Sequence, residues 1–448
     1  MARERAALAH SVHDKLLRTV SPVRLQALVR QGSVSERQRL YPPLVTLGLF
    51  VEQTISRDQA RQDAVGRALS QRTALGLKPN SLNTGPYCKA RQRLSLNLIE
   101  TLAREVAASA QTAAPSHWRW RGREIKLIDG TTVSMPDTVA NQAVFPQNTH
   151  QRPGLGFPQA RMVGVISLST GCVSHWSVSG GVGRGTHEIL HLWRLRDAFS
   201  LGDVVIADRA YGSYFLLAAL RQRGVDCVMR EHQRRKNEHA QAVALGENDQ
   251  RLIWNKPPRP KWMDADTYAA MPEQLTVRQV RDRDWKITTT LTDPAAVARA
   301  EIAWLYRQRW QIELDFRAIK CEMQMHILRC KTPMMVQKEI AAHLLGYNLI
   351  RTAMAEAASE SMSLPRQLSF AAARRAVTSL QEQLRHDPHR NFTAAHGFLL
   401  HRIAYTRIPH RPNRIEPRAV KRRPNCYAFL TVHRNVARHR IQILRLTA

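Results

Sequence analysis

Hydrophobic positions along the chain change their spacing near residue 118. Before it, strand-like runs are few, and the segment from Tyr41 to about Leu75 has apolar residues at helical intervals. After the loop LKPNSLNTG, Pro86 stands where a first helical turn favours proline, at the start of PYCKARQRLSLNLIETLAREV. We therefore predict a helical N-terminal domain over residues 1–115.

Beyond this point, short apolar runs typical of strands take over. The run IKLI ends in Asp129, and VVIA ends in Asp208 about eighty residues later, followed by a stretch with helical spacing. Between them, RMVGVISLST and CVSHWSV predict a hairpin that turns at Thr170 and Gly171, and HEILHLWRLRDAF predicts a helix. Strand, strand, strand, helix, strand, helix is the order of a ribonuclease H-like α/β core.

The strand pattern loosens after Val228. A polar, proline-rich region precedes the alternating pieces EQLTVRQVRD and WKITTTLTD, which together predict a β-rich insertion over residues 226–293. The apolar helix KEIAAHLLGYNLIRTAMAEAA lies where the core resumes, so we expect the core to comprise residues 118–225 and 294–360. Residues 361–448 form a C-terminal basic region in this scheme.

The stretch YRQRWQIELDFRAIK would have two distinct faces as one helix. At about 100° per residue, four polar side chains share an arc of roughly 60°, namely Tyr306, Arg309, Glu313 and Lys320. The adjoining arc is apolar and should be buried; it holds Leu305, Ile312, Phe316, Ile319 and Met323. In the simplest interpretation, Arg309 and Glu313 are an i,i+4 ion pair worth a few tenths of a kcal/mol. A carboxylate bracketed by cations at the edge of a buried face also suits a reactive site.

The charge of the chain points to a polyanionic partner. Its 448 residues, enough for two to four domains, include 67 Lys and Arg but 36 Asp and Glu, a formal net charge of +31. Nucleic acid is the first candidate. A membrane surface is a weaker one, because no segment approaches about 18 uninterrupted apolar residues, and MARERAALAH lacks the apolar core of a signal peptide. We expect a cytoplasmic protein. The six cysteines form no CxxC pair, which argues against a zinc module.

Three acidic residues fit the chemistry of phosphodiester cleavage. Carboxylates at neighbouring strand ends can share a cation, although Asp129 or Asp208 taken alone would more often be a turn residue or helix cap. Hard Mg²⁺ prefers oxygen ligands, and in-line attack on a phosphodiester uses two such ions about 3.5 to 4 Å apart. We predict that Asp129, Asp208 and Glu313 are catalytic and hold two Mg²⁺ (or Mn²⁺) ions, with Asp129 bridging both.

The spacing Tyr, two residues, Arg, three residues, Glu, six residues, Lys resembles the signature of bacterial insertion-sequence transposases, specifically the insertion-sequence-four family. The segments IDGTTVSMPD and ADRAYGSY resemble the settings of that family's two aspartates, and the likeness extends from about residue 80 to 350. It implies a Mg²⁺-dependent cut-and-paste DNA transposase that cleaves strands, forms a hairpin at the transposon end and transfers strands to target DNA. It also implies a homodimer that holds both inverted-repeat ends.

The resemblance further implies residues that contact DNA. Tyr306, Arg309 and Lys320 would grip phosphates and an everted base near the cut, and Trp310 is a candidate stacking surface, although it could equally be core. Basic and aromatic residues in two other motifs complete the candidate set: Arg209 and Tyr211 after the second aspartate, and Lys89, Arg91 and Arg93 in NTGPYCKARQRL. The tail from residue 401 has 12 Lys and Arg and a single acid, and is either a partly ordered basic arm for phosphates or a solubilising end.

Two other functions remain as alternatives. HEILH matches the zinc-peptidase helix HExxH, with His187 and His191 as ligands and Glu188 as base, but no third ligand is evident; its histidines would otherwise face solvent or DNA. The glycine-rich GGVGRGT lacks the Lys-Ser/Thr ending of a phosphate loop, so nucleotide hydrolysis is not expected. A non-catalytic DNA-binding protein derived from a transposase is the second alternative, disfavoured by the intact acidic positions.

Overall fold

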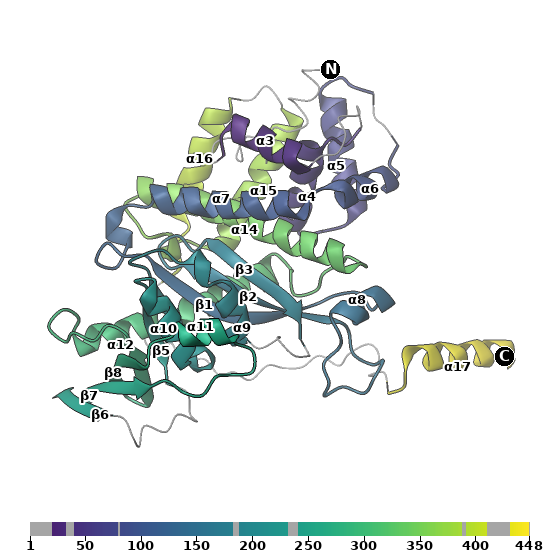
Figure 1. Cartoon of the computed structure of the whole chain (residues 1–448). Helices are drawn as coiled ribbons and strands as arrows, with labels where there is room; N and C mark the ends of the chain where they lie inside the picture. The colour runs from purple at the N-terminus through teal and green to yellow at the C-terminus, as the bar shows by residue number, and fades with distance from the viewer. Residues whose placement is uncertain are drawn as a thin grey trace.

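The computed structural model describes residues 20–32, 40–78, 81–181, 188–231, 241–387, 391–409 and 431–447. A β-sheet lies beneath a layer of helices, and a C-terminal helix extends from the body (Figure 1). The strands are β1 (Ile125–Ser134), β2 (Gln159–Ser167), β3 (Val173–Gly180), β4 (Val204–Ala207), β5 (Asp226–Arg230), β6 (Gln241–Gly246), β7 (Asp249–Asn255), β8 (Gln274–Asp282) and β9 (Trp285–Thr289). They form one nine-stranded mixed sheet in the order β3-β2-β1-β4-β5-β9-β8-β7-β6. The fold is mixed α/β.

Strand β1 connects the two kinds of pairing in the sheet. It is antiparallel to β2 and parallel to β4, which is in turn parallel to β5. The expected β2–β3 hairpin is present, and Gly171 adopts φ 76° in its turn. The expected end of the first strand at Asp129 is wrong: β1 leaves β4 after Ile128 but stays paired with β2 as far as Ser134. The ladder to β2 continues to satisfy its backbone polar groups.

Both faces of this part of the sheet are buried. Side chains alternate between the two faces of a strand. Leu127 and Ile206 therefore lie in the core shared with the helical layer, whereas Ile128 and Val205 lie in a second core with α9 (Glu188–Arg194) and α10 (Tyr214–Gln222). Uninterrupted apolar runs such as IKLI and VVIA are what a sheet covered on both faces requires.

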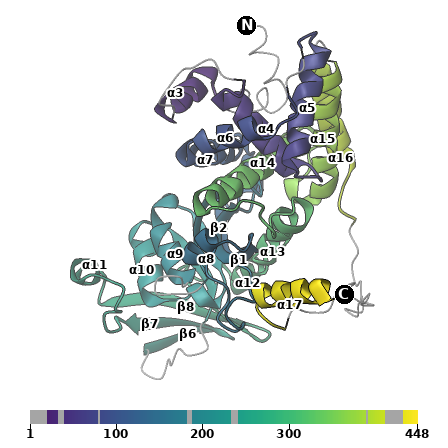
Figure 2. The same ribbon diagram turned by 90° about the vertical axis from the view of Figure 1, so that its right-hand side faces the viewer.

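The helical layer combines segments from both ends of the chain (Figures 1 and 2). Its helices are α3 (Pro22–Gly32), α4 (Pro43–Ile55), α5 (Arg61–Ala74), α6 (Gly85–Arg93), α7 (Leu96–Ala113), α14 (Pro333–Glu360), α15 (Phe370–His386) and α16 (Phe392–Tyr405). Pro86 lies in the first turn of α6, as predicted. The single helix expected after it is wrong, because Leu94 and Ser95 take extended backbone angles and separate α6 from α7.

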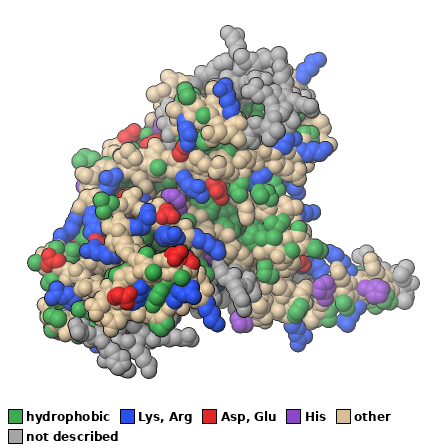
Figure 3. All heavy atoms as spheres, in the orientation of Figure 1, with side chains coloured by type: hydrophobic (Ala, Val, Ile, Leu, Met, Phe, Trp, Pro, Cys, Tyr) green, Lys and Arg blue, Asp and Glu red, His purple; other side chains and the backbone are tan. Residues whose placement is uncertain are grey.

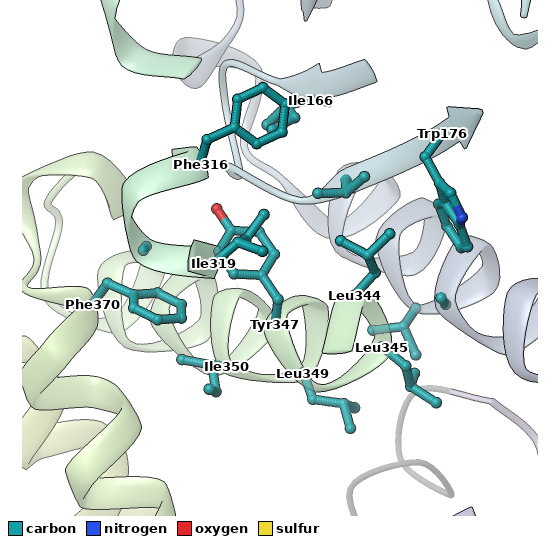
Figure 4. Close-up of a cluster of buried hydrophobic side chains, with 14 of the residues drawn as sticks. Ile166, Trp176, Phe316, Ile319, Leu344, Leu345, Tyr347, Leu349, Ile350 and Phe370 are labelled. Carbon is teal, nitrogen blue, oxygen red and sulfur yellow. The ribbon is translucent and has the colours of Figure 1, made fainter. Parts of the chain in front are cut away.

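Helix α14 is the centre of this layer. It is buried on nearly every side, as expected for a helix without a polar face. Towards the sheet it meets Phe316 and Ile319, which follow Glu313 in the chain (Figure 4). The Asn348 amide donates 2.9 Å hydrogen bonds to the carbonyl oxygens of Ala103 and Val173, so α14 is fixed to both α7 and β3.

The segment expected to be a β-rich insertion extends the same sheet. The two predicted alternating pieces are β8 and β9, and β9 pairs antiparallel with β5. Strand β5 begins at Asp226, where the insertion was expected to start, and it pairs with β4. A short helix, α11 (Ala265–Ala269), lies between β7 and β8. The chain then returns to the helical layer through α12 (Arg299–Arg307).

The stretch from Tyr306 to Lys320 is not one straight helix, as had been expected. After α12, the chain forms α13 (Trp310–Arg317) and then a π-helical turn, η4 (Ala318–Glu322). At the junction, the amides of Arg309 and Ile312 donate to carbonyl oxygens three residues back, which tightens the turn. The predicted apolar stripe is confirmed, since all five of its members are buried: Leu305, Ile312, Phe316, Ile319 and Met323.

The C-terminal helix α17 (Arg434–Thr447) lies apart from the helical layer (Figure 2). Residues 410–430, which carry part of the predicted basic tail, lie outside the described residues, as do residues 182–187 of the glycine-rich turn. Among the helices that the structure describes, none has the length and apolar character needed to cross a membrane.

Candidate active site

Two aspartates lie at the same edge and on the same face of the sheet. In the parallel pair β1–β4, Ile128 is opposite Ala207, so Asp129 and Asp208 follow on adjacent strands. By the alternation of side chains, each shares a face with the residue two before it, which is the face covered by the helical layer. Asp208 also caps the short helix that begins at Arg209, accepting a 2.8 Å hydrogen bond from the amide of Ala210.

Helix α13 brings Glu313 to this face. It packs on β1, and its Phe316 ring reaches the backbone of Gly164, the residue opposite Asp129 in β2. A Cβ at Gly164 would lie 3.4 Å from that ring, an ordinary van der Waals distance, so the Phe316 ring packs directly over this position of β2. The buried stripe of α13 thus fixes its height above the strand that carries the first aspartate.

Arg309 joins two of the three acids. Its guanidinium donates to a Glu313 oxygen at 2.7 Å and to an Asp129 oxygen at 3.4 Å. Burial would lower the pKa of Arg309, but the hydrogen bond to Glu313 and the charges of Tyr306 and Asp129 outweigh it and raise that pKa. The arginine stays charged and compensates the repulsion between the two carboxylates.

Tyr306 connects this pair to Asp208. Burial raises the pKa of its phenol, Arg309 and Arg230 oppose that rise, and the nearby Asp208 carboxylate adds to it. The Trp285 ring stands edge-on to the Tyr306 ring, with centroids 5.4 Å apart. Sequence reasoning missed Arg230 and Trp285 as neighbours of the site. The signal for Arg230 was present, because it ends the apolar strand DCVMR much as Asp208 follows VVIA.

The remaining residues of the signature lie along the same segment. Lys320 is in the π-helical turn η4, half-buried, and forms no ion pair with any described carboxylate. Trp310 is 54% exposed, so it belongs to the surface rather than to the core. An exposed ring at the start of α13 is available to a ligand.

The donor set suits a divalent metal, but the side chains are not in a coordinating arrangement. Three carboxylates supply the oxygen ligands that Mg²⁺ prefers. Among the described residues, no three His, Cys, Asp or Glu side chains are close enough to hold an ion. Instead Arg309 stands between Asp129 and Glu313, where its guanidinium supplies the positive charge. The three carboxylates therefore suit a divalent ion chemically, but Arg309 would have to leave Asp129 and Glu313 before these two acids could bind it.

Two of the expected DNA contacts are wrong. Tyr211 is fully buried in the core that holds α10, because the turn after Asp208 folds its ring inward. Arg91 is only 4% exposed, with its guanidinium 3.9 Å from the centre of the Phe50 ring and bonded to Gln53 and Cys330. Lys89 and Arg93, each two residues from Arg91 on α6, point to the other side of this helix and are exposed. Arg209, in the turn after Asp208, is exposed as well.

The zinc-peptidase alternative is not supported by its histidine. His191 faces neither solvent nor DNA, contrary to expectation: it is buried, and its two ring nitrogens bond to Ser177 and Ser179 at 2.8 Å. Burial, with Arg194 and Arg161 nearby, lowers its pKa to about 4. Both nitrogens are thus engaged within the fold. His187 lies outside the described residues.

Basic side chains predominate over acidic ones on the face drawn in Figure 3. This agrees with the net charge of +31, and such a surface attracts a polyanion. The acids of the candidate site are therefore exceptions in a basic surrounding.

Comparison with known proteins gives a consistent family. The Transposase DDE domain model matches residues 120–349. Transposase InsG for insertion sequence element IS4 of Escherichia coli (strain K12) is 27% identical over 406 residues, which are 89% of each chain. A chain in the cryo-EM structure of a piggyBac transposase synaptic complex with hairpin DNA is similar at a TM-score of 0.45 and 8% identity, covering 89% of this chain and 86% of that one. The family match spans more than half of the chain and includes the positions of all three acids, and this chain belongs to the family of proteins with a transposase DDE domain.

Proposed function

We propose that this transposase moves an insertion sequence by a cut-and-paste route. It cleaves DNA at the inverted-repeat ends, forms a hairpin at each end and transfers the strands to target DNA. The strand order β3-β2-β1-β4-β5 supports a ribonuclease H-like core. Two observations support the proposal: Asp129 and Asp208 directly follow paired residues of the adjacent strands β1 and β4, and Arg309 contacts both Asp129 and Glu313.

The three carboxylates would hold two Mg²⁺ or Mn²⁺ ions. Such ions activate the attacking oxygen and stabilise the departing one in phosphodiester exchange. Asp129 lies between the other two acids, adjacent to Asp208 on the next strand and joined through Arg309 to Glu313, so it is the natural shared ligand. Asp208 and Glu313 would each be a ligand of one of the two ions.

The other residues of the site would position the DNA. Arg309 exchanges its carboxylate partners for a phosphate, which frees Asp129 and Glu313. The Tyr306 hydroxyl stays protonated, because burial raises its pKa, and can donate a hydrogen bond to a phosphate oxygen. Lys320 and Arg209 add positive charge, and the exposed Trp310 ring offers a stacking surface for an everted base.

The rest of the chain would bind and pair the ends. In this proposal residues 1–115 recognise the terminal repeats, with Lys89 and Arg93 as exposed contacts on α6. Residues 118–225 and 294–360 are the catalytic core, 226–293 the insertion, and 361–448 a basic region that contacts phosphates. A homodimer holds the paired ends, and the enzyme works in the bacterial cytoplasm, on the nucleoid.

The test is metal-dependent cleavage of a duplex that carries the terminal repeat bordering its gene. Replacing one acid at a time (Asp129→Asn, Asp208→Asn, Glu313→Gln) should lower the cleavage rate at least about a thousandfold, or roughly 4 kcal/mol, with DNA binding retained. Asp197→Asn, which removes an exposed surface acid paired with Arg223, is the control and should cleave normally. Wild-type protein that binds this duplex but never cuts it would instead favour the non-catalytic alternative.

A further inference from the structure

A groove separates α17 from the loop that joins β1 to β2. Its volume is about 920 Å³. One wall is α8 (Val139–Val144) with the residues after it, and the other is the start of α17, which contributes His433, Arg434 and Arg438. Of the described residues in its lining, only Asp137 is acidic. One wall of the groove therefore carries the positive charges of Arg434 and Arg438.

The start of α17 is fitted to this loop. Gly154 has φ +78°, and a Cβ there would lie 1.9 Å from the Cδ2 atom of His433. Next to it, the Arg434 guanidinium lies 5.2 Å from the centre of the Phe157 ring. The positive φ favours glycine at this position, and a larger residue would displace the His433 ring, so Gly154 suits the close contact between the loop and the start of α17.

The loop wall is held by one amide side chain. Gln147 accepts hydrogen bonds from the amides of Gly154 and Gly156 at 2.9 and 3.1 Å, and donates to the carbonyl oxygens of Gln151 and Arg152 at 3.2 and 2.9 Å. These hydrogen bonds hold the loop wall in one conformation without a bound ligand. Its lining also contains the amide side chains of Gln142, Gln147, Asn148 and Gln151, and amide side chains and arginine are among the groups that bond to DNA phosphates and sugars.

The groove lies beyond the candidate active site along β1. Five residues of strand separate Asp129 from Ser134 at its end, or about 17 Å at 3.3 Å per residue. DNA rises about 3.4 Å per base pair, so this span matches about five base pairs. Figure 2 shows α13 between the N-terminal helices above and α17 below. DNA gripped at the active site and by the N-terminal helices would thus continue, on its other side, towards α17.

We propose that this groove binds the sugar-phosphate backbone of the flanking DNA, about five base pairs beyond the scissile phosphate on the side away from the N-terminal helices. This rests on the proposed function, since it needs a cut at Asp129, Asp208 and Glu313. Arg434 and Arg438, one helical turn apart on α17, each contact a phosphate, and the amide groups of Asn148 and Gln151 hold the backbone from the opposite wall.

The test compares two duplexes with the same terminal repeat, one ending about two base pairs beyond the cut and one about fifteen. Two phosphate contacts steepen the dependence of log affinity on log salt by about 1.8, or about tenfold between 50 and 200 mM. Full-length wild-type protein should show this steeper slope and tighter binding on the longer duplex. The double variant Arg434→Ala/Arg438→Ala should bind both duplexes equally and with the shallower slope.

Two further variants separate a docked groove from general charge. Gly154→Val keeps every charge but forces the His433 ring away, and it should abolish the preference for the longer duplex. Arg440→Ala removes an exposed arginine of α17 that does not line the groove, and it should retain the preference. Equal weakening on both duplexes, or the same loss in Arg440→Ala, would overturn the groove while leaving the proposed function intact. Wild-type protein that binds neither duplex above unrelated DNA would overturn both.

Discussion

Two carboxylates on α13, Glu313 and Asp315, stand two residues apart, and each is held by arginine. Glu313 is paired with Arg309, and their side chains are 36% and 22% exposed. Asp315 is completely buried and is paired with Arg351 and Arg366, which are 6% and 13% exposed. The same kind of carboxylate–arginine pair therefore occurs twice on α13. The Glu313 pair lies at the open edge of the sheet, and the Asp315 pairs lie inside the molecule.

The buried cluster joins α13 to α14 and to the end of β2, whereas the partly exposed one joins α13 only to Asp129 of β1. The Asp315 carboxylate also accepts a 3.1 Å hydrogen bond from the Tyr347 hydroxyl of α14. Arg366 reaches on to the carbonyl oxygens of Ser167 and Leu168 after β2, at 3.0 and 2.7 Å. Figure 4 places Tyr347 beneath the segment that carries Phe316 and Ile319. The cluster thus fixes the rotation of α13, and with it the direction of Glu313.

The difference lies in what happens when an ion pair is opened. Breaking a buried pair leaves a charge without solvent, which costs several kcal/mol, whereas an exposed pair exchanges its partner for water at little cost. The Glu313 pair can therefore open for a cation or a phosphate, and the Asp315 cluster cannot. The catalytic role proposed for Glu313 needs an ion pair that can open. The helix that carries Glu313 needs a buried cluster that stays closed.

The largest expected effect comes from removing the buried acid. Asp315→Ala leaves two buried arginines without a counter-charge, and should lower the free energy of unfolding by about 3 to 5 kcal/mol. Glu313→Ala, its neighbour on the same helix, should change it by no more than about 0.5 kcal/mol. Urea denaturation followed by circular dichroism measures both. Equal stability of the two variants would remove the distinction between the clusters.

A buried base on the other face of the sheet extends the comparison to acid pH. The pKa of His191 falls to about 4, mainly by burial, from an ordinary value of 6.5. Above pH 6.5 the imidazole is neutral in both states; between 6.5 and 4 only the unfolded chain takes up the proton. As the pH falls from 6.5 to 4, the free energy of unfolding should therefore decrease by about 1.4 kcal/mol per pH unit because of this histidine. Below pH 4, His191 should contribute no further decrease.

Urea denaturation at about pH 7, 5.5 and 4, which covers the interval between the unfolded and folded pKa values of His191, measures this dependence. The His191→Gln variant is the comparison. The variant should lose stability less steeply than wild-type protein between the first and last of these pH values. Parallel curves for the two proteins would mean that the buried imidazole takes up a proton without cost, against the burial argument.

The sequence predicted the core strands, but not the two different surroundings of Glu313 and Asp315. IKLI, VVIA and the apolar stripe from Leu305 to Met323 identified the core elements, because burial on both faces demands continuous apolar runs. Asp315 looked like any other charge on that helix, and only tertiary packing from α14 and the turn at Arg366 enclosed it. Arg91 and Tyr211 were misplaced for the same reason: a long polar side chain near a helix end can be solvated or buried with equal local sequence.

The bend between α12 and α13 was also beyond the sequence pattern. The helical period predicted one continuous face, since every residue there is compatible with an α-helix. The tightened turn around Arg309, with several hydrogen bonds to carbonyl oxygens three residues back, and the π-helical turn at Ala318–Glu322 are local adjustments of the helical backbone. The junction between α12 and α13 lies at Arg309, whose contact with Asp129 is long-range and could not be predicted from the helical period.

A smaller change in stability than that of Asp315→Ala is expected for Arg309→Ala. It removes two partly buried ion pairs, with Glu313 and with Asp129, so the free energy of unfolding should fall by no more than about 1 kcal/mol, and less in about 1 M salt, where charges are screened within about 3 Å. Arg307→Ala, which removes an exposed pair two residues away, is a matched control for stability. What separates the two is the site: without Arg309, Asp129 and Glu313 lose the cation between them, and binding of Mn²⁺ measured by calorimetry should become tighter than in wild-type protein. Arg307→Ala should leave Mn²⁺ binding unchanged, because its partner is Asp282. Weaker Mn²⁺ binding in Arg309→Ala would mean that the arginine holds the carboxylates in place for the metal, rather than occupying their shared position until metal and DNA arrive.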